Sequence, residues 1–241
     1  MVTLNTTVST VISTPLRVWL KVVATELTVI MLGAGAYLAV AVGAGDRADT
    51  ATAHARALVA AEGPLAVEGD LAAWWASEPT RALIANAYYV TAHFAAPVVI
   101  FGLLVLFRPT AYRRYRTAFV AASMLGVAVS WVWPTAPPRL LDGLADAPVI
   151  SGLENPYAAF PSMHVGWAVW AALAVGALTA NVWLRALAWL HAVITGVDVL
   201  VTGHHWVLDV VGGALAALAG LAIARAWHGR AESAGNRTPA R

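Results

Sequence analysis

Six long apolar runs constrain this chain more than any other feature of its sequence. They lie near residues 18–44, 83–107, 117–134, 161–181, 186–202 and 205–227, and a helix needs roughly 17–25 apolar residues to cross a hydrocarbon core. The chain is 60% hydrophobic and 12% charged, whereas soluble domains carry about 25% charged residues. We therefore predict an all-α integral membrane protein with six transmembrane helices.

The segment between the first two runs has a different character. Residues 45–82 mix alanine with acids and tryptophan, as in "DLAAWWASEP". We expect an amphipathic helical segment in the extracytoplasmic membrane interface, anchored by Trp74 and Trp75. The predicted organisation is a polar N-terminal segment (1–15), one six-helix domain (16–228) and a disordered cytoplasmic tail (229–241).

The basic residues predict the orientation. With both termini in the cytoplasm, eleven of the fifteen lysines and arginines fall on the inner side, and nine of the thirteen acids fall outside. This bias follows the positive-inside rule and places the chain in the cell membrane with both termini cytoplasmic. The alanine-rich composition favours a bacterial source, and the basic cluster 108–116 is interpreted as a cytoplasmic loop near anionic lipid headgroups.

The residue inventory also limits the chemistry. The chain has no cysteine, which excludes disulfides, zinc–thiolate sites and thiol nucleophiles. We expect membrane lipids as partners and no nucleic acid, and the oligomeric state is left open.

Three polar clusters fall on one surface in this topology: "PTAPPRLL" (134–141), "FPSMH" (160–164) and "TGHHWVLDVVGG" (202–213). In the third, His205 and Asp209 are four residues apart and share a helical face. A carboxylate behind an imidazole fixes its tautomer and leaves the other nitrogen as a nucleophile or base. His204 points about 100° away, so it cannot use the same carboxylate in the same way.

The other two clusters supply groups suited to a phosphate. Pro161 and Ser162 stand at a predicted helix start, where free amides and the Ser162 hydroxyl favour an anion. His164 follows and can protonate a leaving oxygen, while Arg139 can hold a phosphate by two hydrogen bonds. Together these residues predict phosphoryl transfer through a phosphohistidine, without a metal or cofactor.

A second group of polar residues lies in the second apolar run. Asn86, Tyr89 and His93 recur on one helical face. We expect them to line the substrate cavity, and the alternative is hydrogen bonding between helices.

These motifs resemble the type 2 phosphatidic acid phosphatase superfamily. "PSMH" is similar to the family's Pro-Ser-Gly-His, with Met163 in the glycine position, and "HWVLD" is similar to its His-x-x-x-Asp. The resemblance implies six helices, a lipid phosphate substrate and an extracytoplasmic site. It also implies that His205 is the nucleophile, Asp209 its orienting acid and His164 the general acid. We expect Met163 and His204 to contact the substrate, with His204 compensating for an arginine that the chain lacks.

The chain departs from the family pattern at two positions. Val199 stands where the third motif has arginine, and Val132 stands where the first motif has lysine. "PTAPPR" and the arginine-poor third motif resemble the branch that contains inositol phosphorylceramide synthase. Hydrolysis of a phospholipid or isoprenyl (di)phosphate is the default expectation, and transfer of a phospho-headgroup to a lipid hydroxyl is the alternative. A metal transporter or channel using the histidines is a third hypothesis.

Overall fold

The structure is a computed structural model that describes residues 16–141 and 155–235. The described residues form helices and no named strand. The helices are α2 (Leu16–Val42), α3 (Ala48–Glu62), α4 (Glu68–Ala76), α5 (Pro79–Phe107), α6 (Pro109–Val132), α7 (Pro138–Leu141), α8 (Met163–Leu178), α9 (Val182–Val201) and α10 (Val207–Gly235), with 3₁₀ turns η1 (Gly45–Arg47) and η2 (Gly63–Leu65).

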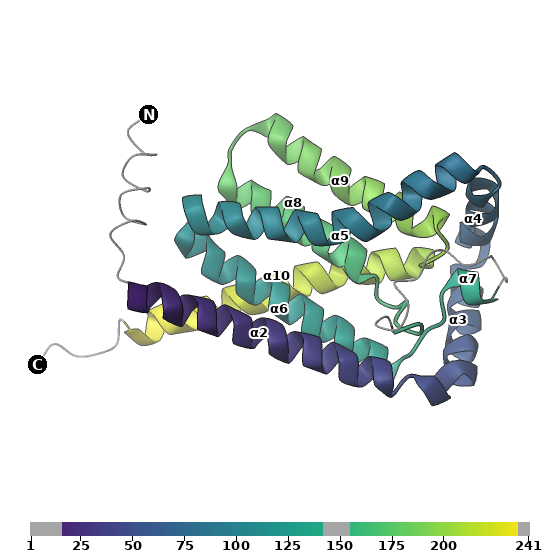
Figure 1. The fold of residues 1–241 in the computed structure, drawn as a ribbon, viewed down its shortest axis with the longest axis horizontal. Helices are drawn as coiled ribbons and strands as arrows, with labels where there is room; N and C mark the ends of the chain where they lie inside the picture. Colours follow the sequence, from purple (N-terminus) through teal and green to yellow (C-terminus); the bar gives the residue numbers. More distant parts are fainter. Residues whose placement is uncertain (1–15, 142–154, 236–241) are drawn as a thin grey trace, which may run out of the picture.

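The long helices run along the molecule and the short ones gather at one end of it (Figure 1). α3, α4 and α7 lie at the end where α9 passes into α10, and the start of α2 and the end of α10 lie at the opposite end. α10 packs against α6 and α8, α8 also packs against α9 and α5, and α2 packs against α6. The loops before α8 and before α10 therefore meet at the end that carries α3, α4 and α7.

Five of the described helices are long and apolar enough to cross a membrane: α2, α5, α6, α9 and α10. α8 is apolar but shorter, at 16 residues. The six helices match the six predicted runs, although α8 falls just short of the usual spanning length. Many large apolar side chains face outward, among them Trp183 at 79% and Val132 at 73% exposure, as expected for helices surrounded by lipid.

The helix starts follow from local side-chain chemistry. Glu78 caps α5 by accepting hydrogen bonds from the N–H groups of Thr80 (3.0 Å) and Arg81 (2.7 Å), and Pro79 fits the first helical position. The Arg81 guanidinium lies 4.1 Å from the Trp74 ring centroid, a cation–π contact that ties α4 to α5. Asn181 caps α9 in the same manner as Glu78 caps α5.

Two glycines allow α10 to approach its neighbours closely. A Cβ on Gly213 would collide with the Ser162 carbonyl oxygen, and a Cβ on Gly220 would collide with the Ala118 carbonyl oxygen. Small residues at helix crossings permit this backbone contact in membranes. The packing fixes α10 against the start of α8 and against α6.

The segment 45–82 packs against the loops that carry the polar clusters. α3 buries Ala51, Ala55 and Leu58 in a small apolar cluster with Ala136, Ala159 and Trp206. The Trp206 indole N–H donates to the Ala136 carbonyl oxygen at 2.8 Å. α3 therefore supports the loops that carry the three polar clusters.

The C-terminal boundary lies further along the chain than predicted. α10 continues as a helix to Gly235, so the predicted start of the tail at residue 229 falls inside this helix. Residues 236–241 and the predicted N-terminal segment 1–15 lie outside the described residues.

Candidate active site

The three polar clusters meet at one end of a large cavity. This cavity has a volume of about 1110 Å³, and its lining includes Arg139, His164, His204 and His205. Arg139 comes from α7, His164 from the start of α8, and the other two histidines from the turn between α9 and α10. Ligand pockets for small molecules are usually about 300–1,000 Å³, so this cavity is large enough for more than a phosphate group.

His205 is held by its Nδ1 atom. Nδ1 lies 2.8 Å from the Ala159 carbonyl oxygen and 3.4 Å from Asp209 Oδ2. Because a carbonyl can only accept, Nδ1 carries the proton in this arrangement and Nε2 is left for a substrate. The i,i+4 pair was predicted, but the shorter contact is made by a backbone oxygen that the sequence pattern does not reveal.

Asp209 also fixes the first turn of α10. Its Oδ2 atom accepts a hydrogen bond from the Trp206 backbone N–H at 2.8 Å, and the residue is fully buried. The same carboxylate oxygen thus lies against both the imidazole and the helix start. The position of the His205 ring is therefore coupled to the start of α10.

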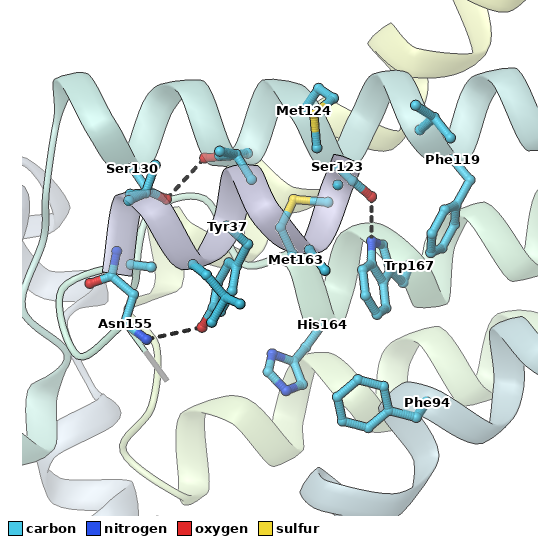
Figure 2. Close-up of a pocket in the computed structure, with 18 of the residues that line it drawn as sticks. Tyr37, Phe94, Phe119, Ser123, Met124, Ser130, Asn155, Met163, His164 and Trp167 are labelled. Atoms are coloured by element: carbon cyan, nitrogen blue, oxygen red, sulfur yellow. Dashed lines mark hydrogen bonds between the residues drawn. The ribbon is translucent and has the colours of Figure 1, made fainter. Parts of the chain in front are cut away.

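His164 faces His205 across the cavity. The two ring centroids are 5.6 Å apart at an interplanar angle of 60°. Figure 2 shows the His164 ring pointing into the cavity, away from the α6 side chains Ser123 and Ser130. The two imidazoles are therefore close enough for both to reach one phosphoryl group.

Arg139 is paired with His204. Arg139 Nη1 lies 2.9 Å from His204 Nε2, and the guanidinium must be the donor because it has no acceptor atom. Burial lowers the pKa of His204 well below its usual value, and the charge of Arg139 lowers it further. His204 is therefore a neutral acceptor that holds the guanidinium at the cavity.

Tyr89 joins the two histidines that do not contact Asp209. Its ring stacks on His164 at 4.1 Å and on His204 at 3.9 Å between centroids. Tyr89 also lines the cavity. The stacked contacts restrict the rotation of both imidazoles, which the helical-face argument could not foresee.

The turn that carries the two histidines is shaped by Gly203 and Val199. Gly203 has a φ of 66°, a left-handed conformation that glycine adopts without steric cost. The Val199 carbonyl oxygen accepts the N–H groups of both His204 and His205 at 3.1 Å, and the Val199 side chain is fully buried. Val199, which stands at the position of the family's arginine, therefore holds both histidines through hydrogen bonds to its backbone carbonyl.

Ser162 and Pro161 differ from the prediction. Ser162 is fully buried, and its hydroxyl accepts the Val165 N–H at 3.5 Å as the N-cap of α8. Pro161 precedes this cap instead of opening the helix. Neither residue lines the cavity. Their contacts hold the start of α8 against α10, where the Ser162 N–H donates to the Asp209 carbonyl oxygen at 3.0 Å.

The remaining predicted site residues have separate outcomes. Met163 lines the cavity and packs into the space left by Gly126. Asn86 does not line the cavity, and its side-chain amide donates to the Ala82 carbonyl oxygen at 2.9 Å. His93 lies on α5, and its side chain is outside what the structure describes.

A buried pair of acids behind the site was missed. Glu62 Oε1 accepts the Leu208 backbone N–H at 2.6 Å, and Glu62 and Glu68 are 4% and 1% exposed. Burial raises the pKa of Glu62 from 4.5 to about 8, and the neighbouring Glu68 raises it as well. The sequence offered only a weak signal, two acids within an amphipathic segment.

The histidines and acids that the structure describes are not grouped as a metal site would require. Among residues 16–141 and 155–235, no group of three or more His, Asp or Glu side chains is placed to hold a metal ion. Within the part of the chain that it describes, the structure therefore shows no set of metal ligands that would support the metal-transporter hypothesis.

Known proteins are similar to this chain in sequence and in fold. Residues 57–223 match the PAP2 superfamily. The chain is 28% identical over 160 residues to an inositol phosphorylceramide synthase of Candida albicans, covering 54% of this chain and 33% of that protein. It thus spans about a third of the length of this curated relative.

The fold has a counterpart among solved structures. The crystal structure of Aquifex aeolicus LpxE matches with a TM-score of 0.50 at 18% identity, covering 61% of this chain and 86% of that one. At 18% identity, the match shows similarity of fold alone. The family match extends from α3 to α10 and includes all three polar clusters, and on this basis the chain belongs to the PAP2 superfamily, with similarity to its inositol phosphorylceramide synthase branch.

Proposed function

We propose that this protein is a membrane lipid-phosphate phosphatase/phosphotransferase that acts through a phosphohistidine on His205. One observation carries the proposal: His205, His164 and Arg139 line the same end of a largely apolar cavity. A nucleophile, an acid and a cation placed around one point are what phosphoryl transfer requires.

The first half of the cycle forms the phosphoenzyme. Arg139 binds the phosphoryl oxygens, and its charge stabilises the transition state. His205 Nε2 attacks phosphorus while the bond from phosphorus to the leaving oxygen breaks. His164 gives its proton to that oxygen, so the alcohol or phosphate leaves in neutralised form. The Ala159 carbonyl and Asp209 stabilise the positive charge that His205 gains.

The second half releases the phosphoryl group. His164, now neutral, takes a proton from water or from an alcohol, whose oxygen attacks phosphorus as the bond to Nε2 breaks. Water gives hydrolysis and free phosphate, and a lipid hydroxyl gives a transferred headgroup. None of these steps requires a metal ion, and loss of activity on chelation with EDTA would contradict the scheme.

Transfer to a lipid hydroxyl is the second candidate. Two observations favour it: the similarity to inositol phosphorylceramide synthase, and Val199 at the position of the family's arginine. The two candidates share the phosphohistidine and differ only in the acceptor. Following a labelled phosphoryl group to free phosphate or to a new lipid distinguishes them.

The proposed orientation places the active site at the extracytoplasmic face of a cell membrane. The start of α2 and the end of α10 lie at the opposite end of the molecule from the site (Figure 1). The end of the molecule opposite the site also carries the basic residues Arg113 and Arg114, near the start of α6, and Arg230, near the end of α10. The positive-inside rule therefore supports cytoplasmic termini.

The decisive test is capture of the phosphoenzyme with a labelled lipid phosphate. His205→Ala is expected to form none, because the substitution removes the attacking nitrogen. His164→Ala is expected to keep some phosphoenzyme and to lose roughly 10²–10⁴-fold in turnover, the usual contribution of a general acid.

A matched histidine provides the control. His228 lies near the far end of α10, with Nε2 3.2 Å from Thr117 Oγ1, and does not line the cavity. His228→Ala is expected to retain wild-type labelling. An active His205→Ala protein would contradict the proposed function.

A further inference from the structure

Two buried acids lie behind the turn that carries His205 and take no part in the proposed cycle. Glu62 ends α3 and Glu68 begins α4, and the 3₁₀ turn between these helices brings the two carboxyl groups side by side. Their exposed fractions are 4% and 1%. Neither acid lines the cavity, so any effect on the reaction passes through other residues.

The surroundings of this acid pair supply too few hydrogen-bond donors for two ionised carboxylates. The Leu208 N–H donates to Glu62 Oε1 at 2.6 Å. Within residues 16–141 and 155–235, no donor reaches Glu62 Oε2 or either carboxyl oxygen of Glu68. A buried carboxylate without partners costs several kcal/mol. One proton between the two carboxyl groups removes this cost, because it gives one of them an O–H that donates to the other.

The acid pair acts on the same helix start as the carboxylate that contacts His205. Among the described residues, the charged groups that act on Glu62 are Glu68 from α4 and Asp209 from α10. Asp209 Oδ2 in turn accepts the Trp206 N–H at 2.8 Å and lies 3.4 Å from His205 Nδ1. A second negative charge on the acid pair would therefore repel the carboxylate that orients His205.

The pH at which the acid pair loses its proton lies in an accessible range. Burial, together with the neighbouring charges of Glu68 and Asp209, raises the pKa of Glu62 from 4.5 to about 8, although the Leu208 N–H acts in the opposite direction. A group with a raised pKa keeps its proton at neutral pH and releases it as the pH rises through this value. The second charge therefore appears at alkaline pH.

We propose that Glu62 and Glu68 share one proton and act together as positioning residues for His205, so that release of this proton to solvent slows phosphoenzyme formation. The shared proton keeps the acid pair at a single negative charge, with Glu62 Oε1 on the Leu208 N–H. Its release adds a charge beside Asp209, and the repulsion displaces the start of α10 together with the His205 ring. The inference rests on the proposed function, because its effect is measured through the phosphoenzyme on His205.

Glu68→Gln tests the role of the shared proton. The glutamine amide replaces that proton as the donor to Glu62, and the side chains keep a single negative charge at every pH. We expect wild-type rates of phosphoenzyme formation at about pH 7, and rates roughly tenfold or more above wild type at about pH 10. The ionisation of His164 affects both proteins alike and cancels in this ratio.

Two further variants bracket this result. Asp70 is an exposed acid on α4, two residues after Glu68, so Asp70→Asn is the matched control and is expected to show the same alkaline decline as wild type. Glu62→Ala leaves the Leu208 N–H without its acceptor. It is expected to slow phosphoenzyme formation roughly tenfold already at about pH 7, the cost of one unsatisfied buried N–H group.

The experiment uses the full-length protein in lipid nanodiscs. The rate of phosphoenzyme formation is measured from about pH 6 to pH 10 with labelled geranyl phosphate and labelled dioctanoyl phosphatidate as probes. Infrared titration of the same proteins detects the proton without a substrate. The difference spectrum of wild type minus Glu68→Gln is expected to contain a protonated-carboxyl band at neutral pH that disappears at alkaline pH.

The outcomes separate this inference from the proposed function. A Glu68→Gln protein with the alkaline decline of wild type, or a difference spectrum without a titrating carboxyl band, would overturn the shared proton, while labelling of His205 would still support the proposed chemistry. Absence of a phosphoenzyme with both probes at every pH would count against the proposed function and against the positioning role together. A wild-type rate of Glu68→Gln at about pH 7 shows that this variant is folded.

Discussion

At the scale of single residues, the pairing of His204 with Arg139 is the contact with the clearest consequence. A neutral imidazole accepts a hydrogen bond from the guanidinium at 2.9 Å, and such a bond to a charged group contributes about 1.5–3 kcal/mol. The pair holds the cation in place without a carboxylate, which would compete with the substrate phosphate for it. His204 is therefore a positioning residue for Arg139.

His204→Ala is expected to lower kcat/KM by roughly 10–100-fold, the loss that corresponds to one such hydrogen bond. His204→Gln, whose side-chain oxygen can accept from Arg139, is expected to recover part of the activity. The pH profile between about pH 6 and 8 should be unchanged in both variants, because the lowered pKa of His204 keeps it neutral there. A shifted profile would show that His204 exchanges protons during turnover.

The sequence predicts some of these residue contacts and not others. The proximity of His205 and Asp209 follows from helical geometry, which is local and needs only their spacing. The Ala159 carbonyl that binds His205 Nδ1, and the contact of Arg139 with His204, depend on the path of loops far apart in the chain. Every residue has a backbone carbonyl, so the residue types do not show which carbonyl accepts a hydrogen bond from His205.

At the scale of elements, α3 contacts the start of α10, next to the turn that carries His204 and His205. Glu62 at its end accepts the Leu208 N–H in the first turn of α10. Asp209, the next residue, contacts His205. The carboxyl group of Glu62 therefore contributes to the stability of the helix start that positions His205, the proposed nucleophile.

The protonation of Glu62 makes the stability of this region depend on pH. Burial raises the pKa of Glu62 to about 8 from an ordinary 4.5, so the folded state binds more protons than the unfolded state between these values. Stability is then fully present below about pH 4.5 and is lost as the pH rises to about 8. The midpoint of thermal unfolding is expected to fall across this range in wild type and to depend less on pH in Glu62→Gln. Equal slopes for the two proteins would contradict the assignment.

The crossing of α8 and α10 gives a second prediction at this scale. A Cβ at Gly213 meets the Ser162 carbonyl group and the Gly166 nitrogen, which are backbone atoms that cannot turn aside. Gly213→Ala is expected to destabilise the protein by about 1–3 kcal/mol, the usual effect of overpacking, and to reduce phosphoenzyme formation by separating His164 from His205.

Gly229 is the matched position for this test, because it lies on the same helix with nothing within 4 Å of an added Cβ. Gly229→Ala is expected to stabilise the helix by roughly 0.5–1 kcal/mol. Thermal unfolding of the two variants in detergent measures the difference. A Gly213→Ala protein as stable as Gly229→Ala would show that the two helices can separate without loss.

At the scale of the whole molecule, hydropathy alone predicts the helices well. Each of the six apolar runs corresponds to a helix, because crossing a bilayer demands length and apolarity that few sequences have by chance. The meeting of the three polar clusters follows from their alternation across the membrane. The cavity could not be predicted, because it depends on how α2 packs against α6, and apolar faces of similar composition do not specify their partners.

The position of α2 has a consequence for how such a chain can diversify. The proposed catalytic groups lie within residues 57–223, which match the superfamily, whereas α2 precedes this range and contributes residues to the lining of the cavity. Substitutions along α2 can alter the width of the cavity while leaving His164 and His205 in place, because neither histidine lies on α2. The proposed catalytic residues and the α2 side of the cavity therefore lie on separate pieces of the polypeptide, so the shape of the cavity can change without a change in the proposed catalytic residues.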